Sequence, residues 1–288
     1  MATIDHQFEP MTLSMVLDRA FRLYSQNFPL MFGITAILHV PILLVSILTV
    51  VLVFSGSHPL LGILAAFSTA LVGLLTLLLV YPLATGATTK AVSDKYLGNP
   101  VTIESALKEA WGNVGTLLLT QLVVGLLVVV GFMLLIVPGV LWMLSYALVP
   151  PVIMIEASDR RISRPVYSIT GRDTKTAAPP ITDRSDIRRR SWQLVKGNRG
   201  KVFLVLLVFY ILSILVSGGA QWVARMIFDT TSSGGATIQS IIGNVVAILV
   251  SPLQTIAITL LYYDFRIRKE GFDLEMLSQA MGTPPVNV

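Results

Sequence analysis

Six long apolar runs dominate this sequence and limit what it can fold into. A helix needs about 20 apolar residues to cross the hydrocarbon core of a bilayer. The runs cover roughly residues 28–54, 60–86, 114–134, 138–156, 201–224 and 239–263. Backbone polar groups in lipid must be satisfied within the protein, and runs of this length without strict alternation favour helices over a β-barrel. The sequence therefore predicts an all-α protein with six transmembrane helices.

The low content of charged residues supports a membrane location for these runs. Only 13% of the 288 residues are charged, whereas soluble domains carry roughly 25%. We expect no cleavable signal peptide, because residues 1–27 are mostly polar. The stretch "IVPG" at 136–139 predicts a tight turn between the third and fourth runs, because Pro and Gly together interrupt helices.

The basic residues predict an orientation. Of the 21 Lys and Arg, all but Arg225 lie before the first run, between the second and third, between the fourth and fifth, or after the sixth. The positive-inside rule places these segments in the cytoplasm. Both termini are therefore predicted to be cytoplasmic, with short loops on the other side.

Three segments that precede apolar runs resemble one another. Asn27, Asn113 and Asn198 are 86 and 85 residues apart, and each follows a short stretch with helical periodicity. Thr12 and Thr102 are placed to cap two of these helices. We expect the helices to lie on the membrane surface with the apolar face toward lipid.

The second run of each pair repeats as well. Pro82 and Pro252 are 170 residues apart, and Asp94 and Asp264 each follow the proline by 12 residues, while the shorter middle unit ends at Glu156. The predicted fold is three parallel repeats about an axis along the membrane normal, each an interfacial amphipathic helix plus a transmembrane hairpin. Within a single membrane domain, 1–288, the bounds are 12–98, 101–156 and 184–270, with a flexible polar cytoplasmic loop at 157–183 and a C-terminal amphipathic tail at 271–288.

Four segments carry a resemblance to a protein family. They are "LDRAFRLYSQNF", "PVIMIE", "SWQLVKGNRGKVF" and "LLYYDFRIRKEGFDLEML". They resemble a family of bacterial uncharacterised polytopic membrane proteins, akin to the membrane domain attached to some glycerophosphodiester phosphodiesterases. The resemblance implies a bacterial cell inner (plasma) membrane and about six helices, but no agreed activity. The polar stretch at 157–186 departs from the family, whose usual connection looks shorter.

The end of the sixth run can be interpreted either as a structural feature or as a catalytic site. Asp264 lies where the apolar run turns to mixed charge. A carboxylate recurs at Asp94, and a catalytic residue would not need to recur in a repeat. We therefore interpret Asp264 as part of a helix leaving the membrane, with Tyr262 and Tyr263 in the interfacial aromatic belt.

The sequence shows no constellation typical of catalysis. There is no cysteine, and His6, His39 and His58 are scattered. The Ser-containing stretches at 54–59 and 217–219 lack a partnered base, and there is no phosphate-binding loop. We expect no enzymatic activity, no cofactor, no metal site and no nucleic-acid partner.

Two sets of residues remain as candidate sites. A basic set, expected to contact anionic membrane lipids or a protein partner, comprises Arg188, Arg189, Arg190, Lys196, Arg199 and Lys201. An intramembrane polar set, which either bonds neighbouring helices or lines a path, comprises His39, Gln121, Asn244 and Gln254. We favour a non-catalytic membrane protein that organises lipids or a partner through its basic cytoplasmic face, although those charges would equally serve to fix topology. The alternative is a small transporter or channel with a pathway along the pseudo-threefold axis.

Overall fold

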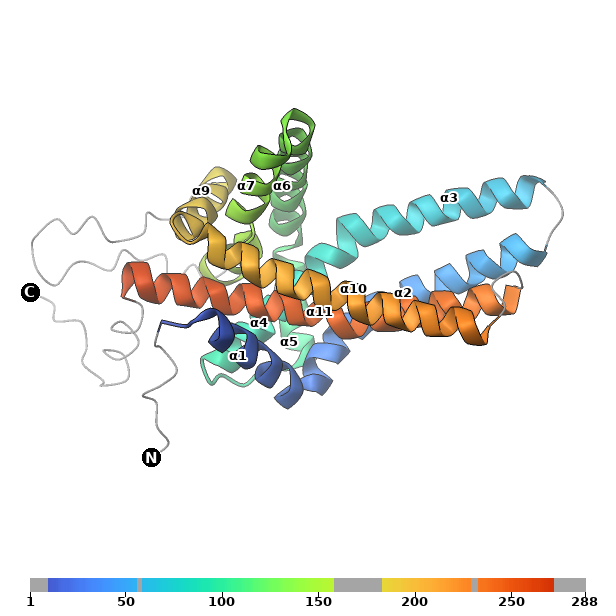
Figure 1. Cartoon of the computed structure of the whole chain (residues 1–288), viewed down its shortest axis with the longest axis horizontal. Helices are drawn as coiled ribbons and strands as arrows, with labels where there is room; N and C mark the ends of the chain where they lie inside the picture. The colour runs from blue at the N-terminus through green and yellow to red at the C-terminus, as the bar shows by residue number, and fades with distance from the viewer. Residues whose placement is uncertain (1–9, 56–58, 158–182, 229–232, 272–288) are drawn as a thin grey trace, which may run out of the picture.

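The chain folds as a set of helices. The computed structural model describes residues 10–55, 59–157, 183–228 and 233–271, and no strand occurs among them (Figure 1). Six segments in these ranges are long and apolar enough to cross a membrane: Phe28–Val51, Gly62–Tyr96, Val114–Leu134, Ile136–Glu156, Arg199–Ile227 and Thr237–Glu270. The prediction of a helical protein with six candidate membrane spans is confirmed. The predicted loop and C-terminal tail lie almost wholly outside the described residues.

The first unit contains a short helix and a long hairpin. Its elements are α1 (Leu13–Gln26), α2 (Phe28–Ser55), α3 (Pro59–Leu75), the π-helical turn η2 (Thr76–Val80) and α4 (Tyr81–Tyr96). The π-helical turn adjoins Pro82, which has no N–H to donate to the preceding turn. The second span was predicted to end at 86, but the helix continues to Tyr96 because Ala87 and Ala91 are fully buried in the core.

The second unit is shorter and more broken. Its elements are α5 (Ile103–Gly112), α6 (Val114–Leu134), α7 (Ile136–Ser145), α8 (Val149–Pro151) and the π-helical η3 (Val152–Ala157). The predicted turn at 136–139 is wrong, because the helix breaks at the single extended residue Leu135 and α7 has already begun at Ile136. Pro138 is tolerated there because the first turn of a helix does not use its N–H groups.

The third unit carries the longest helix. Its elements are α9 (Arg184–Val195), α10 (Arg199–Ile227) and α11 (Ser233–Glu270). Helices α2, α10 and α11 run side by side along the long axis of the molecule (Figure 1). The α6–α7 hairpin stands at a steep angle to them, and α3 diverges from α2. The predicted arrangement of three parallel repeats therefore remains a prediction.

The amphipathic helices begin where the sequence places their caps. The Thr12 hydroxyl accepts from the Met15 N–H, and Thr102 forms a reciprocal capping box with Ser105. Their predicted apolar faces are largely buried against neighbouring helices rather than left to lipid: Val16, Ala20, Ala106, Ala110, Ile187 and Leu194 are at most 2% exposed. Some large apolar residues of the same helices, Phe21 and Trp111, remain exposed.

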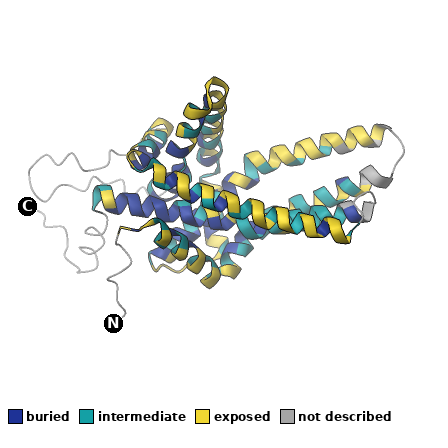
Figure 2. Ribbon diagram, in the orientation of Figure 1, coloured by how far each residue is buried: buried dark blue, intermediate teal, exposed yellow. Residues whose placement is uncertain are grey.

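The bundle has two ends of different character. The basal end carries α1, α5, α9 and the last turns of α4 and α11, and it holds most of the buried residues (Figure 2). The distal halves, which comprise α3, the α6–α7 tip and the far end of α10, expose many large apolar side chains. A helix rises about 1.5 Å per residue, so the 35 residues of the second span exceed the roughly 30 Å hydrocarbon core. This span is therefore longer than a perpendicular crossing requires.

Candidate functional site

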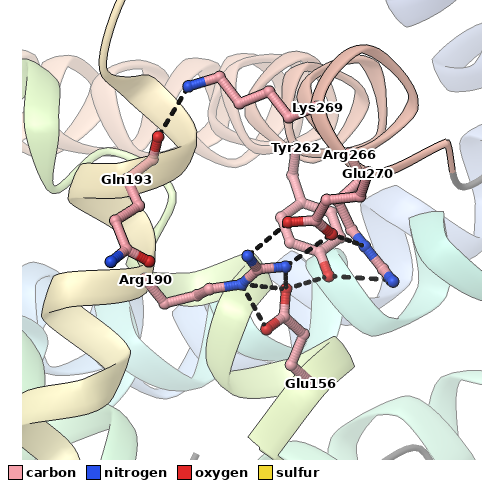
Figure 3. A network of polar contacts seen from close by, with 7 residues as sticks. All are labelled: Glu156, Arg190, Gln193, Tyr262, Arg266, Lys269 and Glu270. Atoms are coloured by element: carbon pink, nitrogen blue, oxygen red, sulfur yellow. Dashed lines mark hydrogen bonds and ion pairs between the residues drawn. The ribbon is translucent and has the colours of Figure 1, made fainter. Parts of the chain in front are cut away.

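A buried arginine joins α9 to two other helices at the basal end (Figure 3). The Arg190 Nε donates to both carboxylate oxygens of Glu156, at 2.8 and 3.1 Å. Its terminal nitrogens bond Glu270, with Nη2 donating to Oε2 at 2.8 Å and Nη1 pairing with Oε1. The arginine side chain is only 7% exposed. One guanidinium thus holds the ends of η3 and α11 against α9 through charge-assisted bonds.

Two further residues complete this network. The Tyr262 hydroxyl donates to Glu156 Oε1 at 2.8 Å, and Arg266 Nε donates to Glu270 Oε2 at 3.2 Å (Figure 3). Two arginines therefore balance two glutamates in a buried setting. Removal of any one of these partners would leave a buried charge unpaired, which is strongly destabilising.

The pKa of Arg190 is raised above its ordinary value. Burial alone would lower it, but hydrogen bonds and charge from Glu270 and Glu156 outweigh that effect. Because this pKa is raised from an already high value, the Arg190 guanidinium remains charged at every working pH.

A second cluster surrounds Asp264. This carboxylate is fully buried and accepts from the Met11 backbone N–H at 2.6 Å, from Lys201 Nζ at 2.5 Å and from Arg268 Nε at 3.0 Å. Lys201 and Arg268 also bond the Met11 carbonyl. The segment before α1 is thereby fixed to the end of α11. The interpretation of Asp264 as structural fits this geometry, although the residue is inside the protein rather than in the headgroup layer.

The placement of Tyr262 and Tyr263 in an aromatic belt is wrong. Both side chains are fully buried. The Tyr263 hydroxyl is 2.6 Å from Ser93 Oγ, and its ring stacks on Tyr96 with centroids 4.7 Å apart. These rings belong to the core because α4 and α11 pack together at the basal end.

The three carboxylates that end the second helices each lie beside the start of another unit. Asp94 shares Lys90 with Glu109 of α5, at 3.3 Å to each. Glu156 pairs with Arg190 of α9, and Asp264 accepts from Met11 just before α1. The contacts therefore run from the first unit to the second, the second to the third and the third to the first.

The structure also contains a central pocket of about 630 Å³. It is lined by residues of α2, α4, α6, α7, α8, α10 and α11. Three of the predicted intramembrane polar residues, His39, Gln121 and Gln254, line it together. Asn244 does not, and its side chain donates to the Ser240 carbonyl within α11. Pro151 and Pro252 line the pocket as well.

The predicted basic set separates into two groups. Arg190 and Lys201 are engaged by buried carboxylates, as described above. Arg189 and Lys196 are exposed, Arg188 is half-buried, and Arg199 lies over the Trp192 ring at 4.6 Å. Among the described residues, no carboxylate pairs with any of these four cations.

The sequence prediction missed several residues of the site. Lys269, whose Nζ bonds the Gln193 and Lys196 carbonyls at 2.7 and 2.6 Å, holds the end of α9 (Figure 3). Thr88 and Thr89 line the pocket and are at most 1% exposed. The available signal was two adjacent hydroxyl residues shortly after Pro82, just beyond the predicted end of the second run. In the described part of the chain, no group of residues is arranged to hold a metal ion.

Comparisons with known proteins identified no relative of this chain. No protein family, no curated protein and no solved structure matches this chain. The resemblance to the membrane domain of glycerophosphodiester phosphodiesterases remains a prediction.

Proposed function

We propose that this chain is a non-catalytic multi-pass protein of the bacterial inner membrane, with the basal end and both termini in the cytoplasm. Its basic residues other than Arg225 precede, follow or connect the spans at the basal side, which supports this orientation. Arg225 lies near the opposite end of α10.

A threefold internal repeat is part of the proposal. Asn27, Asn113 and Asn198 each separate an amphipathic helix from a span, and their carbonyls accept from Met31, Leu117 and Val202, all four residues on and fully buried. Ser93 and Tyr263, 170 residues apart, hydrogen bond directly. Equivalent residues meet in this way when they lie near a symmetry axis, and the cyclic order of the basal contacts agrees with one.

We assign the function to the outer surface of α9 and the start of α10. The carrying observation is that Arg190 and Lys269 fix α9 in place while Arg188, Arg189, Lys196 and Arg199 keep their charges without a carboxylate partner among the described residues. This surface leads directly into the fifth span, at headgroup depth. Each such cation gains roughly 1 kcal/mol beside anionic lipid. The surface binds anionic headgroups and thereby organises lipid around the bundle; an acidic partner protein is the competing occupant.

The test replaces Arg188 and Arg189 with Gln and leaves the structural Arg190 intact. The control, Lys95→Gln with Lys108→Gln, removes the same charge from two exposed residues elsewhere at the basal end. Phosphatidylglycerol that copurifies in mild detergent is measured at low and high salt. We expect the Arg188/Arg189 variant to lose lipid at low salt, whereas the control retains it.

Equal amounts of copurified lipid in all three proteins would contradict the assignment to α9.

Because the chain has no cysteine, single cysteines report its orientation. Lys95→Cys should resist an impermeant thiol reagent in intact cells, and Met133→Cys, 82% exposed at the distal tip, should react.

A second candidate function is transport along the axis. The central pocket favours it, since residues of all three hairpins line it. A cysteine at Thr85, which lines the pocket, distinguishes the two functions. A pathway predicts labelling from both sides of the membrane in oriented vesicles, whereas a non-transporting protein predicts labelling from one side at most.

A further inference from the structure

The central pocket contains polar atoms that the protein itself does not satisfy. The hydroxyls of Thr88 and Thr89 and the Oε1 of Gln121 are buried without a hydrogen-bond partner among the described residues. Both threonines are at least 99% buried, and all three residues line the pocket. A buried polar group without a partner is costly, and in native proteins it usually points to a missing partner.

Most other threonines in these helices have a partner for the hydroxyl; Thr120, which does not line the pocket, is an exception. Hydroxyls in apolar helices ordinarily bond the carbonyl four residues back. Thr35, Thr85 and Thr259 do so, at 2.8 to 3.1 Å. Thr88 and Thr89 lie on the same helix as Thr85 and do not. Their hydroxyls are therefore available to a molecule in the pocket.

The remaining lining restricts the chemistry of that molecule. None of the described lining residues is Asp, Glu, Lys or Arg, and His39 Nδ1 is already bonded to the Thr35 carbonyl at 2.8 Å. Apart from the His39 imidazole, an ionised group here would find no counter-charge, which is strongly unfavourable. The polar end of a ligand must be uncharged, and it must donate to Gln121 Oε1.

The opposite side of the pocket is apolar and reaches the surface. Phe203, Leu206, Leu207 and Ile258 line it. Tyr81 and Tyr210 also line it and are 57% and 63% exposed, so the pocket opens beside them. Both lie within candidate spans, where the bilayer surrounds the protein. A volume of about 630 Å³ is in the range of small-molecule sites, which suits one chain rather than a whole diacyl lipid.

We propose that the central pocket binds a single-chain amphiphile with an uncharged, hydroxyl-bearing head. The head bonds Thr88, Thr89 and Gln121, and the chain passes between Tyr81 of α4 and Tyr210 of α10 toward the bilayer. This site is separate from the basic surface of α9, so either assignment can fail alone.

The test uses the full chain in detergent-free nanodiscs of phosphatidylcholine. The probe is a long-chain monoacylglycerol with a photoreactive diazirine and a click handle on its chain. We expect light to label peptides of α6, α10 or α11 that line the pocket, and unlabelled monoacylglycerol to compete. The lysophosphatidic acid of the same chain adds a charge, and the fatty acid methyl ester lacks a donor. Both should compete at least tenfold more weakly.

The matched variants are Thr88→Val with Thr89→Val, and Thr259→Val as the control. All three changes remove a hydroxyl from a buried threonine at constant shape, but Thr259 bonds its own helix and does not line the pocket. The double variant should bind the probe about tenfold more weakly, a difference of 1.4 kcal/mol. The control should bind like the unaltered protein.

Three results would overturn the proposal. They are labelling that maps outside the pocket, competition by lysophosphatidic acid or the methyl ester equal to that of monoacylglycerol, and unchanged binding by the double variant. The competition series uses only the unaltered protein, so it decides the question even where the double variant does not fold.

Discussion

Hydropathy alone would bury the apolar helix α3 and expose the charged last turns of α11. The structure shows the reverse. In the span that contains α3, only 6% of the most apolar window is buried, whereas 61% is buried in the span that contains α11. Helix α3 is exposed along most of its described length (Figure 2). Leu60, Ile63 and Phe67 are exposed, and the charged Asp264 is not. In the distal halves, apolar residues face lipid and add little to the contacts between helices. Polar bonds at the basal end therefore hold the helices together.

The largest effect should come from breaking a buried pair at the basal end. Asp264→Asn removes the charge that Lys201 and Arg268 share and weakens the bond to Met11. Removing one partner of a buried ion pair costs about 3–5 kcal/mol. The melting temperature in detergent should fall strongly.

The matched control is Asp18→Asn. Asp18 also pairs with a cation four residues away, Arg22, but the two side chains are 65% and 64% exposed. Exposed pairs contribute about 0–1 kcal/mol. Similar melting temperatures for the two variants would show that the basal end is not the more ordered region.

The next effect concerns lipid contact in the distal half. Phe67 in α3 is 68% exposed, and Phe67→Arg would place a charge against hydrocarbon at a cost of about 2.5–3.5 kcal/mol of insertion free energy at mid-membrane. The amount of membrane-inserted protein should fall, whereas Phe67→Leu should leave it unchanged. Tolerance of the arginine would mean that α3 faces water or a polar partner.

The α6–α7 hairpin is an exception among the distal elements, because its helices approach closely. A Cβ on Gly131 would lie 2.9 Å from the Gly139 Cα, and one on Gly139 would lie 2.5 Å from the Phe132 ring. Gly139→Ala should therefore destabilise by about 1–3 kcal/mol through overpacking. Gly73→Ala is the control, since a Cβ there meets nothing within 4 Å. Equal melting temperatures would indicate that the hairpin is looser than described.

The spans were predictable because a segment in contact with lipid must itself be apolar, so that each span is visible as a local run in the sequence. The third was placed at residues 114–134, where α6 lies, and Phe28 was predicted to start the first. The three linking asparagines were recognised for the same reason, since each marks a change from an amphipathic to an apolar pattern. The extension of α4 to Tyr96 and of α11 to Glu270 was not predicted, because packing against other helices sustains those turns.

The candidate site was predictable only in part. The pairs Lys90–Asp94 and Asp264–Arg268 have helical spacing and can be read from the sequence. The pairs Arg190–Glu156 and Met11–Asp264 join residues 34 and 253 positions apart, and no local pattern links them. The six basic candidates therefore looked alike, although Arg190 and Lys201 are structural and the others are not.

The smallest predicted effect tests the contact between Ser93 and Tyr263, which the proposed repeat makes equivalent. Ser93→Ala and Tyr263→Phe each remove one side of the 2.6 Å hydrogen bond, and the phenylalanine keeps the ring contacts with Tyr96 and Tyr262. A double-mutant cycle, read from unfolding by a denaturing detergent, should give a coupling of about 1 kcal/mol. The pair Ser46→Ala and Tyr263→Phe should show no coupling, since Ser46 bonds the Ile42 carbonyl of its own helix. Additive effects at Ser93 and Tyr263 would mean that this contact does not stabilise the basal end, and the buried ion pairs alone would then join the units there.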